Sequence, residues 1–273
     1  MKFFRPLLLL TLLSPTALLA GVVFEVETKS FHSGKAQVDT SEMLVEGKKL
    51  KMAVSGETES TGNAMIYRGD KKEMMMIDHG RKTYSVIDEA TIRNLASQLG
   101  QINQQMEKAL AQVPESQRAM VKEMMEKQMP AAVQRDAPVI DIRKTGETSS
   151  VNGYPSEKFE VYRDDRKVSE LWVTDWNNIK AGAEAAEAFR EMAQFFRKMM
   201  ESFQSVSGNR NFTDSFFGHM SELNGFPVLS KQYDASGSLE SESRLVSATP
   251  RSMENAQFEA PAGYQKQTLP GVD

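Results

Sequence analysis

The stretch MIYRGDKKEMMMIDHGRKTYSVID, residues 65–88, decides the fold class. Short apolar runs alternate here with charged segments, and glycine stands in the segments Arg68-Gly69-Asp70 and Asp78-His79-Gly80. Glycine adopts the positive φ of tight hairpin turns at little steric cost. Short strands joined by such turns predict an antiparallel meander.

Three consecutive methionines, Met74 to Met76, lie within one of these predicted strands. Because side chains alternate across a strand, Met74 and Met76 share one face, while Met75 and Ile77 share the other. Two interpretations stay open. In one, the strand is buried on both faces and needs no ligand, since buried strands commonly carry continuous apolar runs. In the other, one face lines a ligand site, because the flexible methionine side chain adapts to variable apolar surfaces.

The strand pattern continues on both sides of this stretch. Upstream, VVFEVETKSF (22–31) alternates apolar and polar residues, and a turn centred on Gly47 separates two more predicted strands. Downstream of Pro138, the dipeptides Asn152-Gly153 and Asp164-Asp165 predict further turns. We interpret the aspartate pair as a turn and not as a catalytic acid pair. A last hairpin is predicted around Ser236-Gly237.

Two segments have apolar residues every three or four positions, which predicts amphipathic helices. The first stripe runs from Ile92 to Val113, with Asp88 as the N-cap, and a second helix after Pro114 reaches Pro130. The other stripe runs from Ala185 to Val206, and a short helix over 212–223 follows it. Helices inserted between meander strands predict an α+β fold with one antiparallel sheet and helices gathered on one side.

The first twenty residues have the features of a secretory signal peptide. Lys2 and Arg5 precede a short apolar run, and we expect cleavage after Ala20. The run is shorter than the roughly 20 residues that span a bilayer, so we expect no transmembrane segment after cleavage, with a retained membrane anchor as the alternative. The expected location is the periplasm or the exterior, and residues 21–273 form one predicted domain with helical insertions at about 89–130 and 178–223.

Composition excludes several functional classes. The chain has no cysteine, so it folds on its core without disulfides. Its formal net charge of −4 argues against a nucleic-acid partner. No nucleophile elbow or phosphate loop is present, and the three histidines are scattered at His32, His79 and His219. Methionine clusters can hold Cu(I), but alternation lets at most two of Met74 to Met76 face one ion. We therefore expect no enzyme, metal or cofactor, and an enzyme stays open only if distant acidic, histidine or serine residues converge in a pocket with shifted pKa values.

Four segments carry a resemblance to a known family. They are residues 65–88, TGETSSVNGYPSEKFEVYRDDRKVSELWVTDW (145–176), GFPVLSKQYDASGSLESESRLVSA (225–248) and FEAPAGY (258–264). With the signal peptide, they resemble an uncharacterised bacterial periplasmic family whose fold is like that of the LolA/LolB outer-membrane lipoprotein carriers. The resemblance covers about residues 22–266. It implies a strongly curved antiparallel sheet, an incomplete barrel, with helices in its mouth as a lid over a concave surface that in the carriers holds acyl chains.

This resemblance and the apolar stripes together predict a hydrophobic ligand site between the sheet and the helices. Its predicted residues are Met74, Met76, Met106, Met120, Met124, Phe189, Met192, Phe196 and Met199. Ordinary packing of the helices on the sheet, and helix pairing between subunits, are the alternatives for the helical residues. The predicted function is non-catalytic binding of a lipid or acylated protein. The alternative is a protein–protein interaction module in cell-envelope assembly or stress response.

Overall fold

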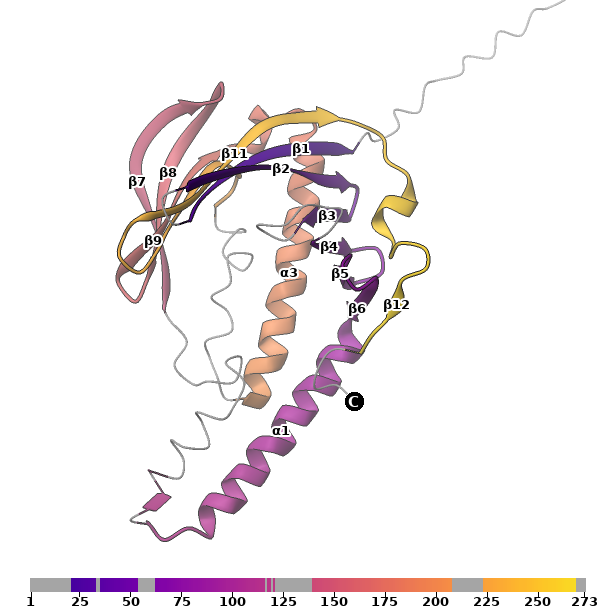
Figure 1. Cartoon of the computed structure of the whole chain (residues 1–273), viewed down its shortest axis with the longest axis vertical. Helices are drawn as coiled ribbons and strands as arrows, with labels where there is room; N and C mark the ends of the chain where they lie inside the picture. The colour runs from indigo at the N-terminus through magenta and orange to yellow at the C-terminus, as the bar shows by residue number, and fades with distance from the viewer. Residues whose placement is uncertain are drawn as a thin grey trace, which may run out of the picture.

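One continuous sheet of twelve strands organises the computed structural model (Figure 1). The model describes residues 21–32, 35–53, 62–115, 117–118, 120, 139–207 and 223–268. The strand order is β12-β6-β5-β4-β3-β2-β1-β11-β10-β9-β8-β7, and every neighbouring pair is antiparallel except β12 with β6. The order runs from β12 to β7 without closing, which confirms the predicted α+β class with an open, largely antiparallel sheet.

The described elements fit the predicted order of strands, helix pair, strands, helix and strands, with α1 as the described member of the helix pair. The strands are β1 (Val22–His32), β2 (Lys35–Glu46), β3 (Lys49–Ala53), β4 (Asn63–Arg68), β5 (Glu73–Asp78), β6 (Thr83–Ile87), β7 (Ile140–Val151), β8 (Tyr154–Arg163), β9 (Arg166–Thr174), β10 (Phe226–Tyr233), β11 (Leu239–Pro250) and β12 (Gln265–Lys266). The helices are α1 (Glu89–Ala111) and α3 (Gly182–Ser207), with short 3-10 segments η2 (Trp176–Asn178) and η4 (Asn255–Phe258).

The predicted turns lie between the observed strands, but in the turns on either side of β5 the positive φ falls on Lys72 (54°) and Lys82 (53°) and not on the expected glycines. Gly47 has a φ of 56° in the turn between β2 and β3. Asn152 and Gly153 have φ values of 49° and 81° between β7 and β8, and Asp164 and Asp165 have 50° and 60° between β8 and β9. Two consecutive residues with positive φ are typical of the two-residue hairpin turns whose twist matches the strands. The aspartate pair is therefore a turn, as predicted.

Both described helices begin and end close to their predicted bounds. The Asp88 carboxylate accepts a hydrogen bond from Thr91 N at 2.8 Å, which confirms it as the N-cap of α1. The hydrogen bonds from the Thr91 backbone and hydroxyl outweigh partial burial and lower the pKa of Asp88. The predicted helix after Pro114, apart from a few residues, and the short helix over 212–223, apart from Leu223, lie outside the described residues, as does the signal peptide.

The sheet curves over α3, and α1 runs alongside α3 (Figure 1). The main apolar core lies between the sheet and these helices, and we call it the helix-side core. It includes Val22, Phe24, Leu50, Tyr67, Met74, Ile92, Phe189, Met192 and Phe226. Phe24 and Phe226 stack with ring centroids 4.7 Å apart, and the Phe189 ring of α3 meets Phe226 at 6.0 Å. The helix therefore packs directly on the middle of the sheet.

A second core lies on the other face of β4 and β5, and we call it the tail-side core. It includes Val23, Leu44, Ile66, Met75, Ile77 and the fully buried Phe258. Phe258 belongs to η4, so the C-terminal tail after β11 covers this face of the sheet. Met74 is 4% exposed in the helix-side core and Met75 is 3% exposed in the tail-side core. The triple methionine is therefore buried on both faces of its strand, which is the first of the two interpretations.

Candidate functional site

The structure brings six of the nine predicted site residues together in the helix-side core. Met74, Phe189, Met192, Phe196 and Met199 are at most 8% exposed, and the partly buried Met76 packs against them. Met120 is 71% exposed. The side chain of Met106 and the whole of Met124 lie outside the described part of the chain. These six side chains belong to the interface between α3 and the sheet, and a ligand would reach the five buried ones only if that packing opened.

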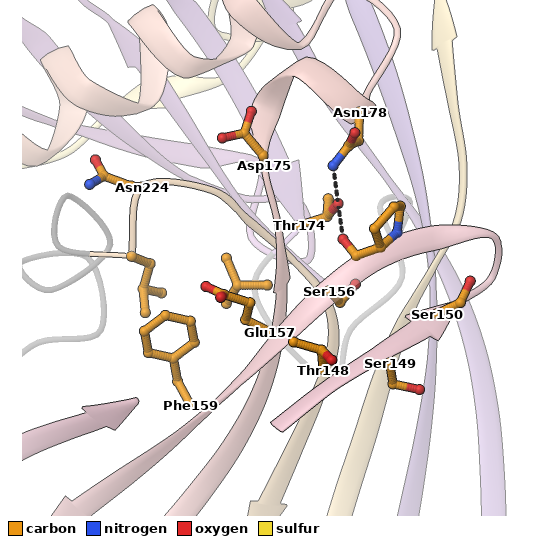
Figure 2. Close-up of a pocket in the computed structure, with 13 residues that line it drawn as sticks. Thr148, Ser149, Ser150, Ser156, Glu157, Phe159, Thr174, Asp175, Asn178 and Asn224 are labelled. Carbon is orange, nitrogen blue, oxygen red and sulfur yellow. Dashed lines mark hydrogen bonds between the residues drawn. The ribbon is translucent and has the colours of Figure 1, made fainter. Parts of the chain in front are cut away.

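An open pocket lies elsewhere, at the β7–β9 end of the sheet (Figure 2). Its volume is about 560 Å³, within the range of roughly 300–1,000 Å³ that is usual for small-molecule sites. The lining residues come from β7, β8, β9, η2 with its N-cap, and the segment that precedes β10: Thr148, Ser149, Ser150, Pro155, Ser156, Glu157, Phe159, Val173, Thr174, Asp175, Asn178, Leu223 and Asn224. None of the nine predicted site residues is among them.

The floor of the pocket is apolar. Phe159, Val173 and Leu223 belong to a third apolar cluster that also contains Leu171, Val161 and Ile142. Cross-strand pairing explains why these side chains gather, because Phe159 pairs with Leu171 and lies two residues from Val161 on one face of β8. Leu223 packs against the cluster from the segment that leads into β10. The floor therefore offers a partly buried apolar surface built by three strands and one connecting segment.

A buried threonine fixes one wall of the pocket. Thr174 is 0% exposed, and its hydroxyl donates to Pro155 O at 2.6 Å and accepts from Asn178 Nδ2 at 3.1 Å (Figure 2). These two bonds join the end of β9 to β8 and to η2. Gly225 lets the neighbouring segment approach, because a Cβ at this position would stand 2.3 Å from Thr174 O. The wall is therefore held by specific contacts and not by loop conformation alone.

The rim of the pocket is polar and carries two carboxylates. Asp175 accepts a hydrogen bond from Asn177 N at 2.8 Å and caps η2. Glu157 pairs with Lys144 Nζ at 2.7 Å. Figure 2 shows Asp175 and Asn224 across the pocket from the strand that carries Thr148. The rim can therefore donate and accept hydrogen bonds, while none of its lining residues is basic.

The opposite face of β8 and β9 is charged and already paired. Glu170 is buried and lies 3.5 Å from Lys158 Nζ and 3.8 Å from Lys231 Nζ. The hydrogen bond from the Tyr162 hydroxyl, followed by that from Lys167, holds the pKa of Glu160 below its usual range. These groups satisfy one another across neighbouring strands. The open pocket on the other face is therefore the better candidate for a ligand.

The described residues show no arrangement that points to metal binding. No group of three or more histidine, aspartate or glutamate side chains is placed to hold a metal ion in the part of the chain that the structure describes. The hydroxyl of Ser156, in the pocket wall, donates to Tyr154 O at 2.9 Å. A ligand in this pocket would therefore meet hydroxyls, amides and carboxylates around an apolar floor, an arrangement suited to binding.

Sequence reasoning missed this pocket because its parts are separated by up to 76 positions, from Thr148 to Asn224. One local signal was present. Asn224-Gly225 is a turn dipeptide, and Asn224 has a φ of 46°. The dipeptide indicates a chain reversal before β10, but it does not say which strand the reversal would touch. That contact depends on the pairing of β9 with β10.

The open antiparallel sheet, with helices on one face and a polar-rimmed pocket at one end, defines an α+β protein built on a single sheet. The chain belongs to DUF4412, a domain of unknown function whose model matches residues 91–264. This confirms the predicted membership of a family without an assigned function. No curated protein sequence matches the chain.

Several solved structures are similar to this chain. An uncharacterised conserved protein from Thermus thermophilus has a TM-score of 0.42 and 9% identity, covering 92% of this chain and 91% of that one. The MucA/MucB complex of Pseudomonas aeruginosa gives 0.35 and 9%, covering 92% and 59%. A domain from Vibrio parahaemolyticus, described as an outer membrane lipoprotein-sorting protein, gives 0.29 and 10%, covering 88% and 90%.

Proposed function

We propose that this chain is a non-catalytic binding protein for an amphipathic ligand, which it holds in the pocket at the β7–β9 end of the sheet. The observation that carries the proposal is the combination of an apolar floor with a polar rim in one open pocket of about 560 Å³. An apolar segment of a lipid or acylated protein would bury surface on the floor, at roughly 0.8 kcal/mol per CH₂. Its polar end would bind the rim.

The same proposal places the protein in the cell envelope. It rests on the signal-like residues 1–20, with cleavage after Ala20, which lie outside the described residues. Among the helices that the structure describes, none is long and apolar enough to cross a membrane. The buried face of α3, which carries Met192, Phe196 and Met199, is a second location for the apolar part of the ligand. A ligand would reach it if the helix moved away from the sheet. The experiment below distinguishes the two locations.

The test is native mass spectrometry of the full chain after incubation with a C16 fatty acid, a lysophospholipid and an acylated peptide. We expect a stoichiometric complex with at least one of these probes. Phe159→Ala should weaken it about tenfold or more, because the substitution removes much of the floor. Phe31→Ala is the matched control, since Phe31 is 38% exposed on β1 and does not line the pocket.

Two outcomes would contradict the proposal. A protein that stays unliganded with all three probes has no such binding function. A complex that survives Phe159→Ala but is lost in Met192→Ala would move the site to the interface under α3, where the sequence placed it. Thermal unfolding of each variant checks that the loss of binding is not a loss of fold.

A further inference from the structure

The two edges of the open sheet differ in whether another described strand pairs with them. At one edge, the C-terminal strand β12 pairs with β6, and Gln265 N and Gln267 N donate to Lys82 O and Tyr84 O at 3.0 and 2.8 Å. At the other edge, no described strand pairs with the outer side of β7 (Figure 1). An uncovered edge presents backbone donors and acceptors to any extended chain that can approach it.

The first half of β7 is protected against such pairing. Asp141, Arg143 and Lys144 place charges along it, and the pairing with β8 is irregular between Lys144 and Thr148. Gly146, within this irregularity, has a φ of 82°. Charges and bulges are common devices that discourage strand addition at an edge. The sequence Thr148-Ser149-Ser150-Val151 that follows is uncharged and pairs regularly with β8.

Hairpin geometry shows which backbone groups of this second half point outward. Val151 pairs with Tyr154 across the two-residue turn Asn152-Gly153, and such a closing pair exchanges hydrogen bonds. Hydrogen-bonded and non-hydrogen-bonded pairs alternate, so the N–H and C=O of Thr148 and Ser150 point away from β8. Pro155 pairs with Ser150, and it has no N–H to donate toward β7. The outer side of Thr148 and Ser150 therefore offers two donors and two acceptors.

The same two residues line the pocket. Thr148 pairs with Glu157, and Glu157 with Val173, so the three side chains lie in one row across β7, β8 and β9. Ser150 lies on the same face as Thr148, two residues along the strand. An added strand would place the side chains opposite Thr148 and Ser150 on that face, beside the pocket. One ligand could then pair with the edge strand through its backbone and place side chains in the pocket.

From these observations we infer that the stretch Thr148–Val151 is a docking edge for an extended peptide segment of a partner protein. The segment adds to β7 by backbone hydrogen bonds, and every second side chain is apolar and enters the pocket toward Phe159. Acidic side chains at these positions are disfavoured, because the lining carries two carboxylates, and only Glu157, paired with Lys144 at 2.7 Å, has a cationic partner, while Asp175 caps η2. This inference uses the pocket of the proposed function but names a peptide as its occupant.

The experiment uses capped nine-residue peptides in which threonine alternates with valine, leucine, phenylalanine or glutamate between terminal lysines. Binding is measured by fluorescence anisotropy, and hydrogen exchange of the full chain locates the contact. We expect the leucine or phenylalanine peptide to bind and the glutamate peptide not to bind. Amide protection should increase over residues 148–151. Methylation of the peptide backbone nitrogens should abolish binding, because strand addition needs those donors.

A matched pair of variants tests the backbone contact itself. Ser150→Pro removes an outward N–H that β8 does not use, and proline is tolerated on an edge strand when its nitrogen faces outward. We expect it to weaken peptide binding about tenfold, as the loss of one backbone hydrogen bond can do, without a change in melting temperature. Ser150→Ala keeps the N–H and should bind as the unchanged protein does.

Four results would overturn the inference. They are the absence of binding by every peptide, equal binding by Ser150→Pro and Ser150→Ala, protection of α3 instead of β7, and concentration-dependent protection of 148–151 without peptide. The last result would mean that a second copy of the chain covers the edge. If the peptides bind and the lipid probes do not, the proposed ligand class is contradicted, but the inference of a docking edge is supported.

Discussion

Thr174 joins three segments of the pocket wall through its hydroxyl. It is fully buried, and its hydroxyl links Pro155 O with the Asn178 side chain. Thr174→Val keeps the shape but leaves the Pro155 carbonyl without its donor, which costs about 1–3 kcal/mol. We expect this loss in the free energy of unfolding, measured by urea denaturation followed by circular dichroism. Thr148→Val, on the exposed rim, should stay within about 0.5 kcal/mol, and equal values for the two variants would contradict this account.

The triple methionine makes a second prediction at the residue scale. Met74 and Met75 are almost fully buried, but in cores on opposite faces of β5. Met74→Ala and Met75→Ala should each lower the free energy of unfolding by about 2–5 kcal/mol, as core truncations do. Chemical denaturation measures both. A strand with only one buried face would show a large effect for one variant and a small effect for its neighbour.

For these residues, the sequence predicts features that depend on neighbouring positions but not contacts with segments far away in the chain. Alternation correctly divides Met74 and Met75 between two faces, because it is a property of any strand. It does not show what covers the second face, which is Phe258 from a tail 183 positions away. The sequence likewise does not show the hydrogen-bond partners of the Thr174 hydroxyl, because they come from β8 and η2.

At the scale of elements, local signals predict where each strand and helix begins and ends. Asp88 caps α1, and turn residues such as Asn152-Gly153 separate the strands as predicted. The helix stripe on α3 also predicts its buried face, since Phe189, Met192 and Phe196 are all buried. The sequence did not indicate that β7 forms one edge of the sheet and that β12 adds to β6 at the other. Strand order depends on pairings such as β1 with β11, whose residues are more than 200 positions apart.

Small residues let α3 lie close to the sheet. Ala185 and Ala188 are 0% exposed and belong to the helix-side core. Ala188→Leu should destabilise the fold by about 1–3 kcal/mol, because the added carbons have no space in a packed core. Thermal and urea unfolding check this value. Ala183→Leu, on the exposed side of the same helix, is the matched control and should change stability by less than about 0.5 kcal/mol. A neutral Ala188→Leu would indicate that α3 lies loosely on the sheet.

At the scale of the whole molecule, one ionic cluster ties the C-terminal tail to the N-terminal meander. Arg68 is buried at the end of β4, and its guanidinium donates to Asp70 Oδ2 at 2.7 Å, to Phe258 O at 3.2 Å and to the Glu259 carboxylate. Lys71 also donates to Glu259, at 3.2 Å. These bonds hold Phe258 over the tail-side core. We therefore expect the cluster to help keep the second face of the sheet covered.

Both carboxylates of this cluster have lowered pKa values. The hydrogen bond from Arg68 is the main cause for Asp70. Partial burial alone would raise the pKa of Glu259, but hydrogen bonds from Arg68 and Lys71 outweigh it. A carboxylate whose pKa is lower in the folded state stabilises the fold above its unfolded pKa, which is about 4. That contribution is lost as the pH falls through the lower, folded pKa.

The tail should therefore loosen in acid. Between pH 7 and pH 5 we expect little change from this cluster, and below about pH 4 we expect hydrogen exchange to increase at residues 253–266 before it increases in β9 and β10. Arg68→Met should expose the tail already at pH 7, because it removes the donor shared by Asp70, Phe258 O and Glu259. Arg251→Met, which removes an exposed pair with Glu42, is the matched control and should keep the acid transition. If the tail of Arg68→Met stayed protected at pH 7 and loosened only in acid, as in the unchanged protein, apolar packing of Phe258 and not the ionic cluster would hold the tail on the sheet.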